Sequence, residues 1–509
     1  MIDAFQTYWP HVLAALSFLL GVPAAIHAAM TKQDVRAAAG WVGVIVLSPI
    51  VGALFYAVAG INRMRVVSIE QQRTLIAAGR RRGEPRSAIS QAYVDQHFGE
   101  RFSAMMRLGD RVCSHVMTDG NRIAVLDGGD EAYDAMIRAI EGARRSVLLE
   151  TYIFDRDRAG ARFVTALVDA VSRGVAVRVL IDAVGVRYSV PSIVGELRDG
   201  GVAVKAFNGN IIMGLRLPYA NLRTHRKILV VDGHVGFMGG MNIREAFVSD
   251  GGAPASARDT HFRVRGPAVA GLFHAAAEDW QFASDEPLEG PAWALDLGTD
   301  DMPHLPIASG SALHAAVPDS PHPDAVEPML VRTVPSGPDR SMETNHRMLM
   351  GAFSVAHRSI RIMSPYFLPD RELISALVTA ARRGVEVDIV VPGNNNLRLV
   401  DRAMTSQFDQ VLRGDCRVWR AHGGFDHSKL LTVDDRWAFV GSSNLDSRSL
   451  RLNFEIDLEV LDTPFAEIIS ARIGEALKSA SPVLLDDLRR KPWPSRILNR
   501  ALWLASPLL

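Results

Sequence analysis

Two short motifs, nearly identical and far apart, constrain this 509-residue chain more than any other feature. Each reads H-x-K-x4-D, and an asparagine follows seventeen positions after each histidine. The residues are His225, Lys227, Asp232 and Asn242 in the first copy and His427, Lys429, Asp434 and Asn444 in the second. Because even the distant asparagine is repeated, the sequence indicates one half-site that occurs twice.

The residues around each motif predict a strand with two polar side chains on one face. Side chains two positions apart in a strand project to the same side, so the histidine and lysine of each copy point together. The apolar residues that follow anchor the strand in the core, and Asp232 and Asp434 then supply turn residues at its far end. We group these aspartates with the catalytic motif but expect them away from the reacting atoms.

An order of strand, helix and strand also occurs twice. In each copy a glycine ends a helix that has one apolar face, and a second strand follows. The first copy has strands at 146–154 and 175–182 and a helix ending at Gly174; the second has strands at 359–367 and 385–391 and a helix from its cap Asp370 to Gly384. This pattern predicts an α/β fold of two duplicated α/β/α halves packed about a pseudo-twofold axis.

Two such halves around one pocket offer a set of groups suited to a phosphodiester. The motif lysines and asparagines hold the non-bridging phosphate oxygens and stabilise the charge that develops there. One neutral imidazole, of His225 or His427, attacks phosphorus, and the other, protonated, gives its proton to the departing alkoxide. The lysines take the place of a cation, so we predict neither a metal nor a cofactor.

A reacting imidazole also needs a partner that fixes its tautomer, as carboxylates do in other catalytic pairs. Asp259 in the stretch DTHFRV and Glu455 in EIDLEV hold corresponding places in the repeat. Each precedes alternating strand residues. We therefore predict that Asp259 and Glu455 are the orienting carboxylates.

Two apolar runs, residues 12–30 and 38–60, precede the α/β part. About 20 helical residues span a bilayer, and the second run meets this length more clearly than the first, which Pro23 and His27 interrupt. A signal peptide or a re-entrant segment is the alternative for the first run, although no lysine or arginine precedes residue 32. We expect a hairpin of two transmembrane helices.

Positive charge is denser after the second run than between the runs. Lys32 and Arg36 lie in the short loop, whereas arginines follow the second run at positions 63, 65, 73, 80, 81 and 82. The positive-inside rule therefore favours a catalytic body on the cytoplasmic side. These arginines form either a solvated linker or a surface that attracts anionic lipid headgroups.

The balanced charge of the chain argues against nucleic acid as a partner. Formal net charge is +0 at pH 7, whereas binding a nucleic-acid backbone requires a basic surface. The two cysteines, Cys113 and Cys416, lie in different halves without metal-ligand spacing. We therefore predict reduced thiols and no zinc site.

Composition divides the chain into six segments. They are a membrane hairpin at 1–62, a basic linker leading into the body at 63–119, the first half at 120–285, a Pro-rich connector at 286–328, the second half at 329–485 and an amphipathic tail at 486–509. The tail combines Trp493 and Trp503 with Arg496 and Arg500. It suits either a helix that closes the core or a helix at the membrane interface.

Together these residues resemble the phospholipase D superfamily, with its paired HKD motifs, and within it the bacterial cardiolipin synthases. The narrower resemblance rests on NLRTHRKILVVDG with GGMN, on VPSGPD at 334–339, on SSNLDSRSLRLNFE, and on Trp41, Pro49, Gly52, Tyr56 and Gly60. It covers nearly the whole chain. The departures are GGMN in place of the serine-containing turn of the second half and the long connector, and neither removes a catalytic group.

The resemblance implies a multi-pass enzyme of the bacterial inner membrane with two phospholipase D-like halves. Such an enzyme joins two phosphatidylglycerol molecules into cardiolipin and glycerol through a phosphatidyl-histidine, with His225 as nucleophile and His427 as acid, although the residues alone leave these roles interchangeable. A membrane-bound phospholipase D-type hydrolase or another phosphatidyltransferase would use the same groups and stays the alternative. A nucleic-acid phosphodiesterase conflicts with the neutral charge, and a silent membrane scaffold with the retained motifs. The oligomeric state is left open.

Overall fold

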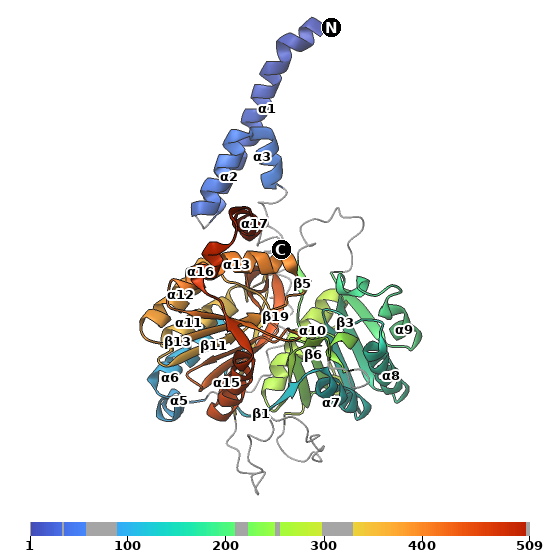
Figure 1. Ribbon diagram of the computed structural model, residues 1–509. Helices are drawn as coiled ribbons and strands as arrows, with labels where there is room; N and C mark the ends of the chain where they lie inside the picture. Colours follow the sequence, from blue (N-terminus) through green and yellow to red (C-terminus); the bar gives the residue numbers. More distant parts are fainter. Residues whose placement is uncertain are drawn as a thin grey trace. The chain divides into compact units, whose positions relative to one another are not determined.

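The computed structural model describes residues 2–32, 35–57, 89–208, 222–249, 255–297, 329–339 and 341–504. Described residues up to 57 belong to one compact unit, and those from 89 onwards belong to a second. The arginine-rich stretch 63–82 and residues 298–328 of the connector lie outside the described residues. Figure 1 labels the helices and strands.

The first unit contains one helix that is long and apolar enough to cross a bilayer. This stretch, Tyr8–Thr31, is most of α1 (Ile2–Thr31). The helix continues through Pro23, so the run that looks interrupted in the sequence is the longer of the two helices.

The second apolar run is not the single spanning helix that we expected. Its described residues divide into α2 (Val35–Leu47) and α3 (Pro49–Phe55). Between them Ser48 leaves the helical conformation, with φ −143° and ψ 77°. The reason is local: the ring of a proline crowds a helical residue that precedes it, and the proline itself starts a new helix well.

Helix α3 turns back along α2. A β-carbon at Gly52 would lie 2.9 Å from the Cα atom of Ile45, so only a glycine allows this approach. His27, which interrupts the apolar run of α1, places its Nδ1 atom 2.8 Å from the Tyr56 hydroxyl, and the Tyr56 and Trp41 rings are 5.2 Å apart. These contacts join the three helices into one small unit.

The second unit has a mixed α/β structure, and its N-terminal half extends from residue 118 to 293. The strands are β1 (Thr118–Asp127), β2 (Ser146–Thr151), β3 (Ala176–Asp182), β4 (Ala203–Phe207), β5 (Arg223–Thr224), β6 (Ile228–Val231), β7 (Val235–Gly239), β8 (Ala257–Arg258) and β9 (Thr260–Arg265). The helices are α7 (Gly129–Glu141), α8 (Arg158–Ser172), η3 (Gly185–Arg187), α9 (Ile193–Asp199), η4 (Glu245–Phe247), α10 (Ala268–Ser284) and η5 (Pro291–Trp293).

The C-terminal half extends from residue 329 to 504. The strands are β10 (Met329–Ser336), β11 (Ser359–Met363), β12 (Phe367–Leu368), β13 (Glu386–Pro392), β14 (Arg417–Ala421), β15 (Phe425–Asp426), β16 (Leu430–Val433), β17 (Trp437–Gly441), β18 (Leu445–Asp446), β19 (Asn453–Leu461) and β20 (Ala480–Pro482). The helices are α11 (Thr344–Val355), α12 (Arg371–Arg382), α13 (Arg398–Leu412), α14 (Ser447–Arg451), α15 (Thr463–Lys478), α16 (Leu485–Arg490) and α17 (Trp493–Leu504).

One sheet of sixteen strands passes through both halves. Its order is β20, β14, β13, β11, β16, β17, β19, β10, β1, β9, β7, β6, β2, β3 and β4, with β5 paired to β19. Strands β10 and β1 pair antiparallel at the centre, and the halves extend outwards from them. In each half the three strands β2, β3 and β4, or β11, β13 and β14, are parallel and the inner strands are antiparallel, and β20 adds an antiparallel edge to the C-terminal half.

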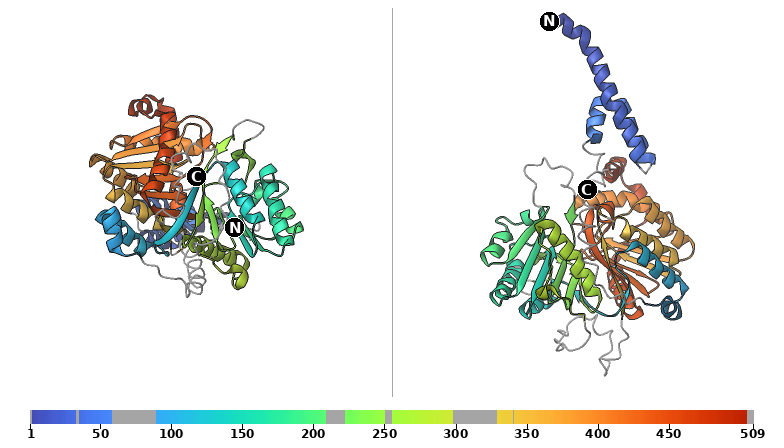
Figure 2. Two further views of the ribbon diagram at one scale, coloured as in Figure 1. Left: turned by 90° about the horizontal axis from the view of Figure 1, so that it is seen from below. Right: turned by 180° about the vertical axis from the view of Figure 1, so that it is seen from behind.

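Helices cover both faces of this sheet because strand side chains alternate between faces (Figures 1 and 2). In β7, Val235 and Phe237 belong to a buried cluster with α7, α8 and α9. Gly236 between them faces α10, where Leu272 and Val269 lie against it. In the C-terminal half α15 packs on the strands in the same manner as α10.

The repeated strand–helix–strand pattern is present at the expected places, which confirms the α/β class. Asp370 caps α12 by accepting a hydrogen bond from the Leu373 N–H at 3.1 Å. Gly384 follows α12 with φ +95°, and Gly174 follows α8 with φ +85°. A residue with a side chain rarely adopts this backbone conformation, so glycine ends both helices.

Residues 91–112 fall in the segment expected to be a basic linker, yet they form two packed helices, α5 (Gln91–Phe98) and α6 (Glu100–Val112). Phe102 and Met105 of α6 are buried in the core of the C-terminal half. Arg332 of β10 also bonds to Asp110 of α6 and to Glu459 of β19, at 2.7 Å each. This segment is therefore part of the second unit.

Candidate active site

Each motif begins in a short extended segment that pairs with the opposite half of the second unit. Strand β5, before the first motif, pairs in parallel with the start of β19, and the His225 N–H donates to the Phe454 carbonyl at 2.8 Å. Strand β15, before the second motif, pairs in parallel with β8, and the His427 N–H donates to the Arg258 carbonyl at 2.7 Å. The histidines and lysines were expected on one strand, but each pair directly precedes its strand, β6 or β16.

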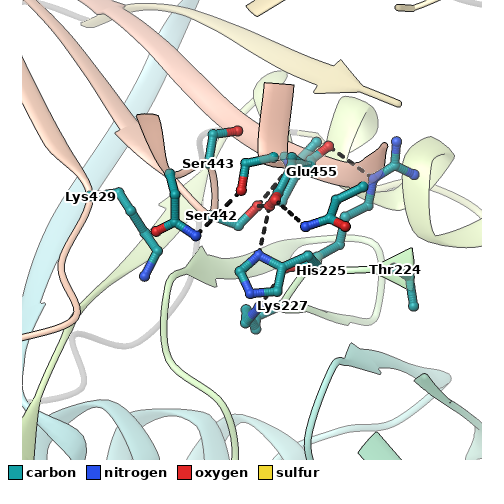
Figure 3. A network of polar contacts seen from close by, with 12 residues as sticks. Thr224, His225, Lys227, Lys429, Ser442, Ser443 and Glu455 are labelled. Carbon is teal, nitrogen blue, oxygen red and sulfur yellow. Dashed lines mark hydrogen bonds and ion pairs between the residues drawn. The ribbon is translucent and has the colours of Figure 1, made fainter. Parts of the chain in front are cut away.

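This crossed pairing brings each predicted carboxylate to the histidine of the other half. The Nδ1 atom of His225 lies 2.9 Å from Oε2 of Glu455, a contact drawn in Figure 3. The Nδ1 atom of His427 lies 2.9 Å from Oδ2 of Asp259. Both carboxylates are fully buried. A neutral imidazole in such a pair carries its proton on Nδ1, toward the carboxylate, and its lone pair on Nε2.

The two motif lysines are buried beside the histidines. Lys227 Nζ donates to the His225 carbonyl at 2.5 Å, and Lys429 Nζ lies 2.8 Å from His427 Nδ1 and 3.8 Å from Asp259 Oδ2. Burial lowers the pKa of both ammonium groups, that of Lys227 to about 7. An anion in the site would favour their charged forms.

Burial also lowers the pKa of both motif imidazoles, to about 4 for His427 and well below the ordinary histidine range for His225. The neighbouring lysine of each motif lowers it further. Both imidazoles are therefore neutral near pH 7 until a negative charge enters. A phosphodiester anion provides that charge and raises the pKa of each imidazole.

The two motif asparagines hold their positions through contacts on opposite ends of the amide. The Asn242 side-chain oxygen accepts a hydrogen bond from the Ile153 N–H at 3.2 Å, which leaves its NH2 group for a ligand. The Asn444 NH2 group donates to Ser449 Oγ at 3.3 Å. Both asparagines are buried, with exposed fractions of 6% for Asn242 and 4% for Asn444. Both line the cavity described next.

The motif histidines and asparagines meet in one cavity of about 570 Å³ between the halves. Both halves also contribute aromatic, basic and apolar side chains to its lining, among them Tyr152, Tyr188, Arg223, Arg244, Tyr366, Leu397, Val400 and Arg448. Three arginines against one acidic residue, Asp446, give the cavity a positive character, and the apolar side chains give it a surface for hydrocarbon. Such a lining suits an amphipathic anion.

Two tyrosines that were not among the predicted site residues flank the histidines. The Tyr152 ring lies 5.4 Å from the His225 ring, and the Tyr366 ring lies 6.0 Å from the His427 ring. Each tyrosine closely follows the first strand of its repeat, β2 or β11. Comparing these two stretches with each other would have identified them.

The two carboxylates that contact the motif histidines differ in their other hydrogen bonds. Ser442 Oγ donates to Glu455 Oε2 at 2.6 Å (Figure 3). Asn453 Nδ2 donates to Glu455 Oε1 at 3.2 Å. The residue that corresponds to Ser442 in the first half is Gly240. A β-carbon there would lie 2.6 Å from both carboxylate oxygens of Asp259, so no side chain fits. The two halves are chemically unequal at this point.

The motif aspartates lie at turns, as expected, and do not line the cavity. Asp232 accepts backbone hydrogen bonds from residues 144, 145 and 146 at 2.8–2.9 Å. Asp434 accepts them from residues 357, 358 and 359 and also pairs with Arg101. Both have positive φ, 54° and 56°, which aspartate tolerates better than most residues. Their contacts are structural, and nothing in the geometry supports a part in catalysis.

We expect Asp434→Ala to reduce stability by about 2–3 kcal/mol, because three backbone N–H groups lose their acceptor. Although burial raises the pKa of Asp434, hydrogen bonds from these N–H groups lower it by more. The pKa of Asp434 is thus lower in the folded protein than in the unfolded chain, where an aspartate has a pKa of about 3.9. Its charged form therefore stabilises the fold at pH values above about 3.9, and this contribution is lost as the pH falls through the folded-state pKa. Thermal unfolding of both proteins in detergent should differ at pH 7 and converge below pH 4. Full stability with lost turnover would instead make Asp434 catalytic.

One group of possible metal ligands occurs among the described residues, namely His346, Asp370 and Glu372. His346 Nε2 lies 2.9 Å from Asp370 Oδ2, and Asp370 also caps α12 and pairs with Arg451 at 3.3 Å. The three residues do not line the cavity. Capping of α12 and the ion pairs of Asp370 therefore explain why these residues lie together.

The chain matches a sequence family described as "Cardiolipin synthase, PLD-like domain" over residues 136–251 and 349–476. Each matched segment contains one complete motif and its asparagine. The chain is 31% identical over 515 residues to cardiolipin synthase A of Pseudomonas putida KT2440, covering 100% of both chains. It is 30% identical over 516 residues to the cardiolipin synthase of Geobacillus sp. (strain WCH70), covering 99% of this chain and 95% of that one.

Among solved structures, the chain is similar to phosphatidylserine synthase of Haemophilus influenzae Rd KW20. The TM-score is 0.55 with 16% sequence identity, and the match covers 80% of this chain and 100% of that one. At this identity the similarity concerns the fold alone. It agrees with the α/β arrangement of the second unit.

Proposed function

Because this chain belongs to the cardiolipin synthase family, we propose that it is a phosphatidyltransferase that converts two phosphatidylglycerol molecules into cardiolipin and glycerol. One observation supports the chemistry above the others: two histidines, each paired with a buried carboxylate of the opposite half, face one cavity. A reaction in two displacements at one phosphorus atom needs two such imidazoles.

In the first displacement, Nε2 of His225 attacks phosphorus and forms a P–N bond while the P–O bond to glycerol breaks. His427, protonated once the phosphate anion is bound, gives its proton to the departing glycerol oxygen. Lys227, Lys429 and the amides of the asparagines turn to the non-bridging oxygens and stabilise the added charge. The product of this step is a phosphatidyl-histidine.

In the second displacement, the groups exchange tasks. His427, now neutral, removes the proton from a terminal hydroxyl of a second phosphatidylglycerol, and that oxygen attacks phosphorus. The P–N bond to His225 breaks, and cardiolipin leaves. The number of phosphodiester bonds is unchanged, so no energy source beyond the substrates is needed.

The unequal hydrogen bonds on the two carboxylates favour His225 as the nucleophile. Glu455 shares its charge with two further donors, which makes it a weaker partner for a protonated His225. Asp259 accepts one further hydrogen bond, from the Thr260 N–H to its Oδ1 atom at 2.8 Å, and Lys429 Nζ lies 3.8 Å from its Oδ2 atom. Among the described residues no hydroxyl bonds to Oδ2, the atom that faces His427, whereas Ser442 bonds to the Glu455 oxygen that faces His225, so the acid role fits His427.

We further propose that the two halves are duplicates related by a pseudo-twofold axis through the active site. The strand order on either side of the β10–β1 pair supports this: β19, β17, β16, β11, β13 and β14 correspond to β9, β7, β6, β2, β3 and β4. The crossed histidine–carboxylate pairs obey the same symmetry.

The proposed location is the bacterial inner membrane, with the second unit on the cytoplasmic side. The apolar stretch of α1 and the arginines after residue 62 support this arrangement. A reporter fused after residue 65 should give a cytoplasmic signal. A periplasmic signal would reverse the proposed topology.

Products distinguish transfer from hydrolysis. Purified protein in bilayers of glycerol-labelled phosphatidylglycerol should release one glycerol for each cardiolipin formed, and EDTA should not slow it because the lysines supply the positive charge. Phosphatidic acid as the main product would identify a hydrolase of the phospholipase D type. Loss of turnover in EDTA that only Mg²⁺ restores would contradict the mechanism.

A further inference from the structure

Helix α17 carries an exposed apolar stripe. At 100° per residue, Trp493, Ile497 and Leu504 lie within about 40° of one another around the helix. Their exposed fractions are 72%, 58% and 74%. The other side of the helix, with Leu502 and Trp503, packs against the core of the C-terminal half. The helix is therefore held in place while one apolar side stays uncovered.

The stripe forms part of the wall of a basic groove of about 500 Å³ between α13, α16 and α17, because Trp493, Ile497 and Leu504 all line it. Apolar and basic side chains share its walls, including Leu485, Leu488, Arg413, Arg489, Lys491, Arg496 and Arg500. The one acidic residue of its lining is Asp409, whose Oδ2 lies 3.3 Å from Arg413 and 3.5 Å from Arg500. Five basic residues against one acidic residue make the groove strongly positive.

A buried amide also faces this groove. Asn499 lines it and is only 6% exposed, and its side-chain oxygen has no hydrogen-bond partner within the described ranges. Rotating the side-chain amide by 180° places its NH2 group where the unbonded oxygen lies. That group can then donate to an anionic oxygen in the groove.

Helix α13 connects this surface to the active site. Leu397, directly before α13, and Val400 in its first turn line the catalytic cavity. Leu397 and Leu399 are 47% and 55% exposed. Further along the same helix, Thr405 and Asp409 line the basic groove. Exposed apolar side chains thus occur both at the cavity mouth and on α17, which packs on α13.

We propose that α17 docks the catalytic body onto the surface of an anionic phospholipid bilayer, with its apolar stripe among the acyl chains and a lipid phosphate in the basic groove. Tryptophan, aliphatic and arginine side chains on one side of a helix are typical of interfacial helices. The anionic bilayer satisfies both the uncovered apolar side and the excess positive charge. The start of α13 then lies at the same surface, where lipid substrates enter the cavity.

A fluorescent label can report this docking in the full-length protein. An environment-sensitive dye on Ile497→Cys is compared with the same dye on Leu498→Cys, an exposed position on the same helix but outside the stripe. The protein is reconstituted into phosphatidylcholine bilayers with increasing phosphatidylserine, which is not the proposed donor, so turnover does not change the lipids. The unsubstituted protein corrects for labelling of Cys113 and Cys416.

We expect the dye at position 497, but not at 498, to shift to shorter wavelength and to be quenched by lipid-borne quenchers as phosphatidylserine increases. Each basic residue near an anionic surface contributes about fivefold to binding. Arg496→Gln with Arg500→Gln should therefore weaken docking about 25-fold and raise the phosphatidylserine fraction needed for half of the response. Arg138→Gln with Arg198→Gln removes the same charge from α7 and α9 and should leave the response unchanged.

Any one of four results would overturn the proposal. The two dyes could respond alike, or the response could be independent of phosphatidylserine. The control pair on α7 and α9 could weaken docking as much as the α17 pair. The dye at 497 could be shielded in detergent in proportion to protein concentration, which would mean that a second copy of the chain covers the stripe. None of these readouts depends on turnover, so they test docking separately from the proposed reaction.

Discussion

The His225→Ala protein should form neither cardiolipin nor a covalent phosphatidyl intermediate. The nucleophile is absent, and water or lipid alcohol attacking phosphorus directly would meet the full uncatalysed barrier. Enzymes of this kind lower such barriers by many powers of ten, so we expect turnover to fall by at least about 10⁴-fold. No change of leaving group should restore it.

The His427→Ala protein should behave differently, because its nucleophile is intact. Glycerol leaves without a proton donor, so the intermediate forms slowly. A substrate whose leaving alcohol is more acidic needs that proton less and should partly restore formation of the intermediate. The same substrate should not rescue His225→Ala, and this contrast separates the two roles.

Trapping the intermediate tests the assignment directly. Enzyme incubated with labelled phosphatidylglycerol is quenched without acid, because P–N bonds are acid-labile, and the label is located by peptide mapping. Label on His427 would exchange the roles and keep the mechanism. Full turnover in either single variant, with no label on His225 or His427, would mean that the two motifs do not form one active site.

The second large effect concerns the crossed carboxylates. Glu455→Gln and Asp259→Asn keep the shape of each side chain but remove the charge that holds the imidazole tautomer. Loss of the corresponding carboxylate in a catalytic triad reduces turnover about 10⁴-fold, and we expect about 10³–10⁴-fold here. Asp457→Asn is the matched control, since Asp457 is a buried carboxylate of the same strand β19 that bonds Ser443 and Asn345 and no motif histidine.

Because the carboxylates act through different histidines, the two variants should also differ from each other. Asp259→Asn impairs His427, the proposed acid, so a better leaving group should partly rescue it. Glu455→Gln impairs His225, the proposed nucleophile, and should resist rescue. Equal rescue of both variants would contradict the crossed assignment, and an equal loss in Asp457→Asn would indicate general damage to β19.

Much of the fold follows from local patterns in the sequence. The α/β class, the caps at Asp370 and Gly384, and the turns at Asp232 and Asp434 depend on residues close together in the chain. The break before Pro49 is equally local, since proline restricts the residue before it, but we gave the apolar length of 38–60 more weight than that restriction. Helices α5 and α6 were missed because long-range packing stabilises them.

The sequence by itself determined which groups we propose for the chemistry, because an unusual set of side chains at fixed spacing occurs twice. Only the tertiary structure decided how these groups combine. Strand β5 pairs with β19, and β15 pairs with β8, so each histidine meets the carboxylate of the other half. The same packing places Ser442 on one carboxylate and leaves room only for Gly240 beside the other. Contacts between residues some 170 to 230 positions apart carry no periodic signal along the chain, and they arise only when the two halves pack together.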